Sequence, residues 1–316
     1  MGNKLDCTNL NVLITGGYGF IGSSIARKFF EEGANIFIID NLSTGKPSNI
    51  SFTHQFYHLG IEDPHCETVF ESNVIDVVIH CAAQTSVQFS LANPLTDSHT
   101  NIMGLIRMLN LSKKYNVKHF IFTSSAAVYG NQGRIDIQED LPLNPLSIYG
   151  LNKKIGEEYC LKWQEYYNLP VLIYRFANVY GPHQSLLSGA VIPVLVNKIT
   201  TNAEMVIYGD GQQTRDFLFV EDVATAVVKG VKAKLCGVYN LSTNEEVTLN
   251  HLLDVIREEG YSLNVKYEED RPGDIRHSRL NNEKIKKTLG WNAAISINEG
   301  LKRCLQQINS NQNILH

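Results

Sequence analysis

The sequence lacks several features that mark particular classes of protein. No apolar run approaches the ~20 residues of a membrane-spanning helix, and the first residues, MGNKLDCTNL, contain no apolar core of a signal peptide. The six cysteines form no C-x-x-C pair, which argues against a zinc site and a disulfide framework and favours reduced thiols in the cytoplasm. Lys and Arg (28) do not outnumber Asp and Glu (32), so a nucleic-acid partner is not expected. We therefore expect a cytoplasmic protein without a membrane segment, a metal or a nucleic-acid partner.

What the sequence does contain is an alternation of short apolar runs and longer amphipathic stretches. Strands are expected at residues 11–17, 35–40, 74–83, 119–125 and 171–179, with helices between them. Near-continuous apolar strands separated by helices indicate a parallel sheet covered on both faces, hence a doubly wound α/β fold. The rhythm changes after Gly181-Pro182. We therefore expect a nucleotide-binding domain at residues 1–180 and a smaller mixed α/β lobe at 181–316, with residues at about 214–235 returning to the first domain.

A glycine-rich turn follows the first expected strand. ITGGYGFIG places Gly16, Gly19 and Gly22 in a G-x-x-G-x-x-G spacing, where glycines let a pyrophosphate approach the backbone and the helix N-terminus. A tight turn without a ligand is the plainer alternative. Asp40 ends the second strand, where a carboxylate can accept both hydroxyls of an adenosine ribose and would repel a 2′-phosphate. The sequence therefore predicts a Rossmann sheet that binds NAD in preference to NADP.

Three further residues form a set suited to proton transfer. TSSAAVYG puts Ser125 at the end of a strand, although a hydroxyl there can also be a simple cap. Tyr149 and Lys153 in SIYGLNK share one helix face, where a half-buried Tyr beside a solvated Lys is the plain alternative. The Lys153 ammonium and a positive nicotinamide ring would lower the pKa of the Tyr149 phenol from its reference value of about 10. Tyr149 could then take a proton from a carbinol, relayed by Ser125, while hydride leaves for NAD.

With these residues in this order, the sequence resembles an extended short-chain dehydrogenase/reductase over nearly its whole length. It looks most like the NAD-dependent nucleotide-sugar epimerases, specifically UDP-hexose 4-epimerases. The matching motifs are HCAA (80–83), TN (100–101), YRFANVYGP (174–182), VIP (191–193), RDFLFVEDVA (215–224) and RPGD (271–274). The related 4,6-dehydratases usually carry an Asp-Glu pair where this chain has Ser125-Ala126, and the classical reductases are shorter and lack the second lobe.

The resemblance implies residue roles as well as an activity. It implies a homodimer that epimerises C4 of a UDP-hexose through a transient 4-keto sugar, with Ser125, Tyr149 and Lys153 as catalytic residues. The implied NAD-binding residues are Gly16, Gly19, Phe20, Ile21, Gly22, Asp40, Asn41, Ser43, Thr44, Gly45, Gly60, Ile61, Ala82, Ala83, Gln84, Asn101, Ser124, Tyr149, Lys153 and Phe176. The implied substrate-binding residues are Ser86, Ser125, Ala126, Tyr149, Asn178, Val191, Ile207, Tyr208, Arg215, Arg271, Asp274 and Ser278, and Arg215 and Arg271 would bind the diphosphate.

One departure from the family pattern concerns the adenine end of NAD. Relatives often have D-I-x-D, with the first Asp contacting adenine, whereas this chain has Gly60-Ile61-Glu62-Asp63. The first carboxylate is therefore missing, and Ile61 would serve through its backbone.

The sugar is suggested by Ser278, seven positions after Arg271. In the 4-epimerases this position lines the sugar pocket, and a small residue leaves room for an N-acetyl group. We therefore expect UDP-GlcNAc/UDP-GalNAc, and UDP-Glc/UDP-Gal beside them, as substrates. Two alternatives stay open: another nucleotide-sugar epimerase or 4-ketoreductase, and an NAD-binding sensor without catalysis, which usually lacks the Tyr or the Lys.

Overall fold

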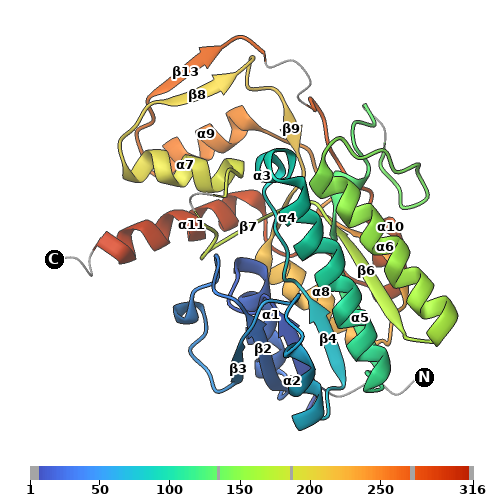
Figure 1. Cartoon of the computed structure of the whole chain (residues 1–316). Coiled ribbons are helices and arrows are strands. Elements are labelled where there is room, and N and C mark those ends of the chain that lie inside the picture. Colours follow the sequence, from blue (N-terminus) through green and yellow to red (C-terminus); the bar gives the residue numbers. More distant parts are fainter. Residues whose placement is uncertain (1–6, 134–135, 186–187, 271–274, 313–316) are drawn as a thin grey trace.

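A seven-stranded parallel sheet forms the centre of the computed structural model, which describes residues 7–133, 136–185, 188–270 and 275–312 (Figure 1). The strand order is β11–β6–β5–β4–β1–β2–β3. The strands are β1 (Asn11–Thr15), β2 (Asn35–Asp40), β3 (Gln55–His58), β4 (Val77–His80), β5 (His119–Ser125), β6 (Val171–Phe176) and β11 (Gly237–Leu241). The order reverses between β1 and β4, which is where a ligand crevice opens at the carboxyl ends of the strands. The predicted doubly wound α/β fold is confirmed.

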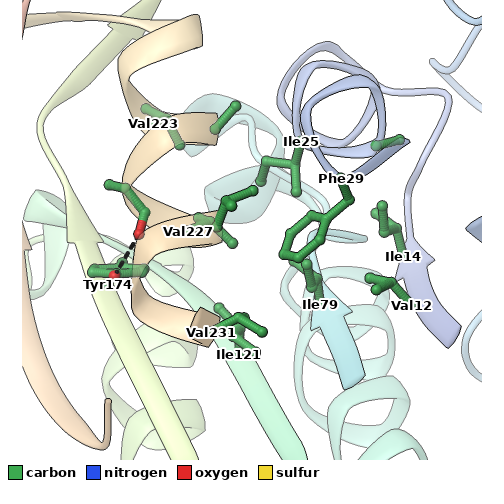
Figure 2. Packing of buried hydrophobic residues seen from close by; sticks show 14 of the residues in the cluster. Val12, Ile14, Ile25, Phe29, Ile79, Ile121, Tyr174, Val223, Val227 and Val231 are labelled. Carbon is green, nitrogen blue, oxygen red and sulfur yellow. Dashed lines mark hydrogen bonds between the residues drawn. The ribbon is translucent and has the colours of Figure 1, made fainter. Parts of the chain in front are cut away.

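Helices cover both faces of this sheet. On one face α1 (Phe20–Glu31) and α8 (Val220–Lys232) pack against each other, and Phe29 and Val227 meet the strand residue Ile79 in one buried cluster (Figure 2). On the other face lie α2 (Cys66–Ser72), α5 (Leu105–Lys114) and α6 (Ile148–Tyr167). Because both faces are covered, the central strands β1, β2, β4, β5 and β6 are largely buried and mostly apolar, which is the pattern that predicted them.

The far edge of the sheet comes from late in the chain. β11 follows α8 and pairs with β6, so the segment that returns to the sheet runs to Leu241. The strand expected at residues 171–179 divides at Ala177: β6 stays in the sheet, and β7 (Asn178–Tyr180) leaves it to pair with β10 (Phe217–Phe219). Apart from Arg175 and Asn178 the run is apolar, so the sequence pattern does not reveal this change of partner. The division into two domains stays a prediction.

The remaining elements form a second layer of structure beside the carboxyl ends of the strands, at the upper left in Figure 1. Helices α7 (Val191–Thr200), α9 (Leu249–Glu258) and α11 (Ile297–Gln312) share a buried cluster that includes Leu195, Leu252 and Leu301. Two pairs of short strands complete this second layer. β8 (Met205–Tyr208) pairs with β13 (Val265–Glu268), and β9 (Thr214–Arg215) pairs with β12 (Val247–Thr248). Throughout the described residues, every helix is too short or too polar to cross a membrane.

Short helices join the two layers on the side of α6. They are α3 (Val87–Ala92), α4 (Pro94–Ser98), the π-helical turn η2 (His99–Gly104) and the 3-10 turn η3 (Ala126–Val128). The 3-10 turn η1 (Pro47–Asn49) lies elsewhere, between β2 and β3, and α10 (Glu283–Leu289) packs near β11. η2 runs directly into α5, and α3, α4 and η2 all contact α6. They hold the start of α6 beside the strand ends.

Candidate active site

The glycine turn between β1 and α1 leaves no room for side chains. Gly16 has a φ of 67°, and a Cβ there would lie 2.8 Å from the Cα of Ala82, which follows β4. A Cβ on Gly22 would lie 2.2 Å from the carbonyl oxygen of Gly16. The cap residue of α1 is Gly19, which has no side chain to occupy the helix N-terminus. The bare backbone and the free helix end fit a pyrophosphate, as the sequence predicts.

Asp40 lies beside this turn at the end of β2. Its Oδ2 accepts a hydrogen bond from the Tyr18 backbone N–H (2.9 Å) and its Oδ1 from that of Leu42 (2.8 Å). A carboxylate has about four lone-pair sites, so both oxygens keep acceptor capacity for ribose hydroxyls. Gly45 lies against it, since a Cβ there would be 2.9 Å from each carboxylate oxygen. The loop from Asn41 to Gly45 therefore curves around Asp40.

The other predicted cofactor residues also gather at the carboxyl edge of the sheet. They are Phe20, Ile21, Asn41, Ser43 and Thr44 near the first two strands, Gly60 and Ile61 after β3, Ala82, Ala83 and Gln84 after β4, Ser124 in β5 and Phe176 at the end of β6. Asn101 reaches this edge from η2: its Oδ1 accepts from the Gln84 N–H (2.9 Å) and its Nδ2 donates to the Gln84 carbonyl (3.0 Å). Asn101 thus holds the loop after β4 in place.

Ser125, Tyr149 and Lys153 come together where β5 ends and α6 begins. Ser125 ends β5, and its Oγ accepts from the Ala127 N–H (3.2 Å). Ser147 caps α6 and so places Tyr149 in the first turn, near enough to Ser125 for the Ser125 hydroxyl to act on the pKa of its phenol. The Lys153 Nζ lies 5.9 Å from the centre of the Tyr149 ring and donates to the Thr123 carbonyl (2.7 Å). The predicted set is therefore assembled in space.

Burial controls the charge state of this set. It raises the pKa of Tyr149 to about 12, against which the hydrogen bond with Ser125 acts, and it lowers the pKa of Lys153 to about 8. The sequence predicted a lowered phenol pKa from the neighbouring ammonium, but desolvation of the half-buried ring is the larger effect in the protein alone. A positive nicotinamide ring would act in the opposite direction.

A buried carboxylate that sequence reasoning missed braces the start of α6. Asp97 is fully buried, and its Oδ2 accepts from the side-chain amides of Asn101 (3.1 Å) and Asn152 (2.7 Å). The Gln84 amide donates to its Oδ1. Asn152 precedes Lys153, so Asp97 ties the catalytic turn of α6 to the loop after β4. The sequence signal was weak, because Asp97 lies in a polar stretch typical of a loop.

A buried ion pair links α6 to β6 and contacts β5, the strand that ends at Ser125. Glu157 lies one helical turn after Lys153, and both its oxygens accept from the Arg175 Nε (3.0 and 3.1 Å), while the Arg175 Nη2 adds a third contact of 2.7 Å. Ser124, the neighbour of Ser125, donates its hydroxyl to the same carboxylate. Arg175 also donates to the Tyr129 hydroxyl and the Glu139 carbonyl (2.9 Å each). A charged residue within the apolar run VLIYRF was the signal that could have revealed this pair.

A cavity of about 350 Å³ lies in the second layer. Four of the predicted substrate residues line it, namely Val191, Ile207, Tyr208 and Arg215. Residues that were not predicted complete the lining: Val206, Gln213, Leu249, Asp270, Ile275 and Arg276. Apolar walls with a guanidinium group suit a flat, partly apolar ligand that carries negative charge.

The other predicted substrate residues are not part of this lining within the described chain. Ser86 caps α3 by accepting from the Phe89 N–H (3.2 Å), Ala126 starts η3, and the Asn178 side chain donates to the Asp216 carbonyl (3.1 Å). Ser278 is half-buried, after the cavity residue Arg276. Arg271 and Asp274 lie outside the described residues.

Comparisons with known proteins agree with this geometry. Residues 12–242 match the NAD dependent epimerase/dehydratase family. A putative UDP-glucose 4-epimerase from Methanocaldococcus jannaschii is 37% identical over 95% of this chain and 99% of its own. The solved UDP-glucose 4-epimerase of Thermotoga maritima with UDP-glucose is 35% identical, with a TM-score of 0.91 and coverage of 96% of this chain and 100% of its own.

A second similar solved structure is named for an N-acetylated substrate. The UDP-N-acetylglucosamine 4-epimerase of Methanobrevibacter ruminantium M1, in complex with UDP-N-acetylmuramic acid, is 33% identical, with a TM-score of 0.91 and coverage of 96% of this chain and 99% of its own. The glycine turn, Asp40 and the assembled Ser125, Tyr149 and Lys153 thus stand in a chain that is matched along nearly its whole length. The chain belongs to the NAD-dependent epimerase/dehydratase family, and NAD is the cofactor of this enzyme.

Proposed function

We propose that the protein epimerises C4 of a UDP-hexose through a transient 4-keto sugar. The observation that carries this proposal is the position of the Tyr149 side chain in the first turn of α6, beside the end of β5 with Ser125 and one helical turn from the buried Lys153, at the crevice edge of the sheet. A phenol held in this way can take a proton from a carbinol and return it. The relatives described above, which are UDP-sugar 4-epimerases by name, support the same activity.

Each residue of the set has a distinct task. NAD, when bound, supplies reversible hydride exchange with a carbinol carbon. Tyr149 takes the proton of the sugar 4-hydroxyl and later returns it when the opposite face of the sugar is presented. Ser125 holds the sugar oxygen and relays the proton. Lys153 favours the phenolate through its charge and holds the nicotinamide ribose, so the same three residues serve both directions of the reaction.

Inversion also requires that the nucleotide stays bound while the sugar turns. We assign this task to the cavity in the second layer, where Arg215 offers a planar guanidinium that can pair with phosphate oxygens. Arg271, Asp274 and Asn178 are proposed to contribute on the strength of the family pattern alone. If the nucleotide is bound through its diphosphate, the hexose can rotate and present either face to the nicotinamide.

The sugar is proposed to be N-acetylated, with the unsubstituted hexose also accepted. Ser278 is the small residue on which this depends. Replacing Ser278 with tyrosine is expected to suppress turnover of UDP-GlcNAc and leave that of UDP-Glc. Equal effects on the two sugars, or none on UDP-GlcNAc, would remove Ser278 from the sugar pocket.

The deciding experiment uses no added cofactor. Purified protein is incubated with UDP-Glc or UDP-GlcNAc, and the products are separated by chromatography. An epimerase forms the 4-epimer of the sugar supplied, a 4-ketoreductase stalls without external NAD(P)H, a dehydratase forms a 4-keto-6-deoxy sugar, and a sensor forms nothing. Replacing Tyr149 with phenylalanine is expected to abolish turnover while the circular dichroism spectrum and the retained NAD stay unchanged. Full turnover by that variant would refute the assigned role.

We further propose a homodimer in the cytoplasm. Large apolar side chains are exposed near the contact between α6 and the η2–α5 segment: Met103 is 55% exposed, and Leu151 and Leu161 are each 39% exposed. Burying such a face against a second copy would remove apolar surface from water. Replacing Leu161 with glutamate should halve the mass measured by light scattering. A wild-type protein that is already a monomer at assay concentration would contradict the proposal.

A further inference from the structure

The glycine at position 60 and the glutamate at position 62 are coupled in space. A Cβ built on Gly60 would lie 2.6 Å from the Oε1, 2.9 Å from the Cδ and 3.0 Å from the Oε2 of Glu62. These are the three nearest heavy atoms, so the Glu62 carboxylate lies in the space that a side chain at residue 60 would occupy. Gly60 is not among the glycines with positive φ, so its backbone would accept another residue. The carboxylate of Glu62 thus folds back toward the position where the related sequences carry an Asp.

This carboxylate has an unused acceptor. The Glu62 Oε2 is buried without a hydrogen-bond partner among the described residues. Burying a carboxylate oxygen without a donor is costly, so such an atom in a folded protein points to a partner that is supplied from outside. The next carboxylate, Asp63, differs in this respect: its Oδ1 accepts from both the backbone N–H and the ring Nδ1 of His65 (2.8 Å each).

The position of Glu62 in the fold identifies the donor. Residues 59–62 follow β3, whose last residue, His58, pairs in register with Asp40 at the end of β2. In a doubly wound sheet the adenosine half of NAD lies across the carboxyl ends of the first strands, with its ribose at the carboxylate after β2. Ile61 is fixed nearby, because a Cβ on Gly104 would lie 2.5 Å from its Cδ1. The base attached to that ribose is adenine, whose 6-amino group is a hydrogen-bond donor.

We propose that Glu62 accepts a hydrogen bond from the 6-amino group of the adenine of NAD and so takes over the task of the carboxylate that is absent at residue 60. The contact makes the protein selective for a base with an exocyclic amino group. Hypoxanthine carries a carbonyl oxygen at this place, which would face the carboxylate oxygen with no proton between them. The proposal depends on NAD as cofactor and is independent of the sugar chemistry, because dinucleotide binding is measured without substrate.

The test is a competition between two dinucleotides. Full-length protein is equilibrated with an equimolar excess of NAD and nicotinamide hypoxanthine dinucleotide until the retained ratio is constant, and the bound dinucleotides are then released and quantified. A hydrogen bond to a charged acceptor predicts that the wild type retains NAD at least roughly tenfold over the hypoxanthine analogue. Glu62→Gln should bring this ratio within about threefold of unity, since an amide can donate to the carbonyl oxygen as well as accept from an amino group.

Two further variants separate the proposal from a purely structural role. Asp63→Asn removes a neighbouring charge and should leave the retained ratio at the wild-type value. Glu62→Ala should lose the preference, and adding Gly60→Asp to it should restore the preference by growing a carboxylate into the vacated space. If Glu62→Gln keeps the wild-type ratio, or weakens retention of both dinucleotides equally, Glu62 does not read the base and the proposal is wrong.

Discussion

Replacing Glu157 with glutamine tests how much the structure depends on the ion pair behind the catalytic strand. The change leaves the Arg175 guanidinium, whose side chain is only 6% exposed, with the Tyr129 hydroxyl and the Glu139 carbonyl but without a countercharge. Removing one partner of a buried pair costs about 3–5 kcal/mol, because the remaining charge is buried and uncompensated. Since a typical protein is stable by only about 5–15 kcal/mol, the loss should be large and easily measured.

The measurement is urea unfolding followed by tryptophan fluorescence. The chain has two tryptophans, and one of them, Trp163, lies in α6 with Glu157, whereas Trp291 is buried in the cluster under α1 and α8. The matched control is Glu165→Gln on the same helix, because the Glu165–Lys162 pair is exposed (58% and 52%). This control should change the free energy of unfolding by about 0.5 kcal/mol or less.

A small difference between the two variants would refute the reasoning. If Glu157→Gln costs less than about 1 kcal/mol more than Glu165→Gln, the buried pair is not a net requirement of the fold. Should Glu157→Gln fail to fold, the double variant Glu157→Leu with Arg175→Met still decides the question. Removing both charges should destabilise the protein less than the single variant does, since no unpaired charge is left behind.

Three further predictions follow from close contacts and from burial. Gly22→Ala places a methyl group against the Gly16 carbonyl and should lower NAD retention at least roughly tenfold; unchanged retention would contradict a closed turn. Burial lowers the pKa of His119 to about 4, so the folded state binds fewer protons than the unfolded state between about pH 4 and 6.5, and stability is lost as pH falls through this window. His119→Gln should remove up to about 3 kcal/mol of the difference in urea stability between pH 7.5 and pH 4.5, and an unaltered difference would contradict this. Gly230→Ala would bring a methyl group 2.4 Å from the Tyr174 hydroxyl and should lower the free energy of unfolding by about 1–3 kcal/mol. Adding Tyr174→Phe should recover part of this loss, because it removes the hydroxyl that the methyl group meets. If nothing is recovered, the strain does not come from that contact.

The sequence predicted those parts of the fold that follow from local pattern. The expected strand at residues 35–40 and that at 119–125 have the observed bounds, because a buried parallel strand is mostly apolar and so stands out from its neighbours in the sequence. β3 was not predicted, since it is an edge strand whose residues are mostly exposed and whose apolar pattern is therefore weak. A local pattern also does not show that β7 leaves the sheet, because its partner β10 comes from a distant part of the chain.

In the candidate site too, residues that belong to a known motif were predicted, and residues that act through distant partners were not. Tyr149, Lys153 and Ser125 were found because their order and spacing are typical of a known chemistry, and the fold brings them together. Asp97 and Arg175 were not found, since their function is to hold other residues and depends on distant partners. The lowered pKa of Tyr149 was predicted for the complex with NAD, and in the protein without NAD burial raises this pKa to about 12, because spacing along a helix gives no measure of burial.

The edge strand β11 has a consequence for synthesis of the chain on the ribosome. β6 ends at Phe176, but its partner is complete only at Leu241, about 65 residues later. At a translation rate of about 5–20 residues per second, the backbone of β6 waits roughly 3–13 seconds with one side unpaired. An unpaired strand that is rich in apolar residues, as β6 is, is a template for association with other chains. A chain that stops in this interval would therefore be poorly soluble, although every residue of the catalytic set has already been made.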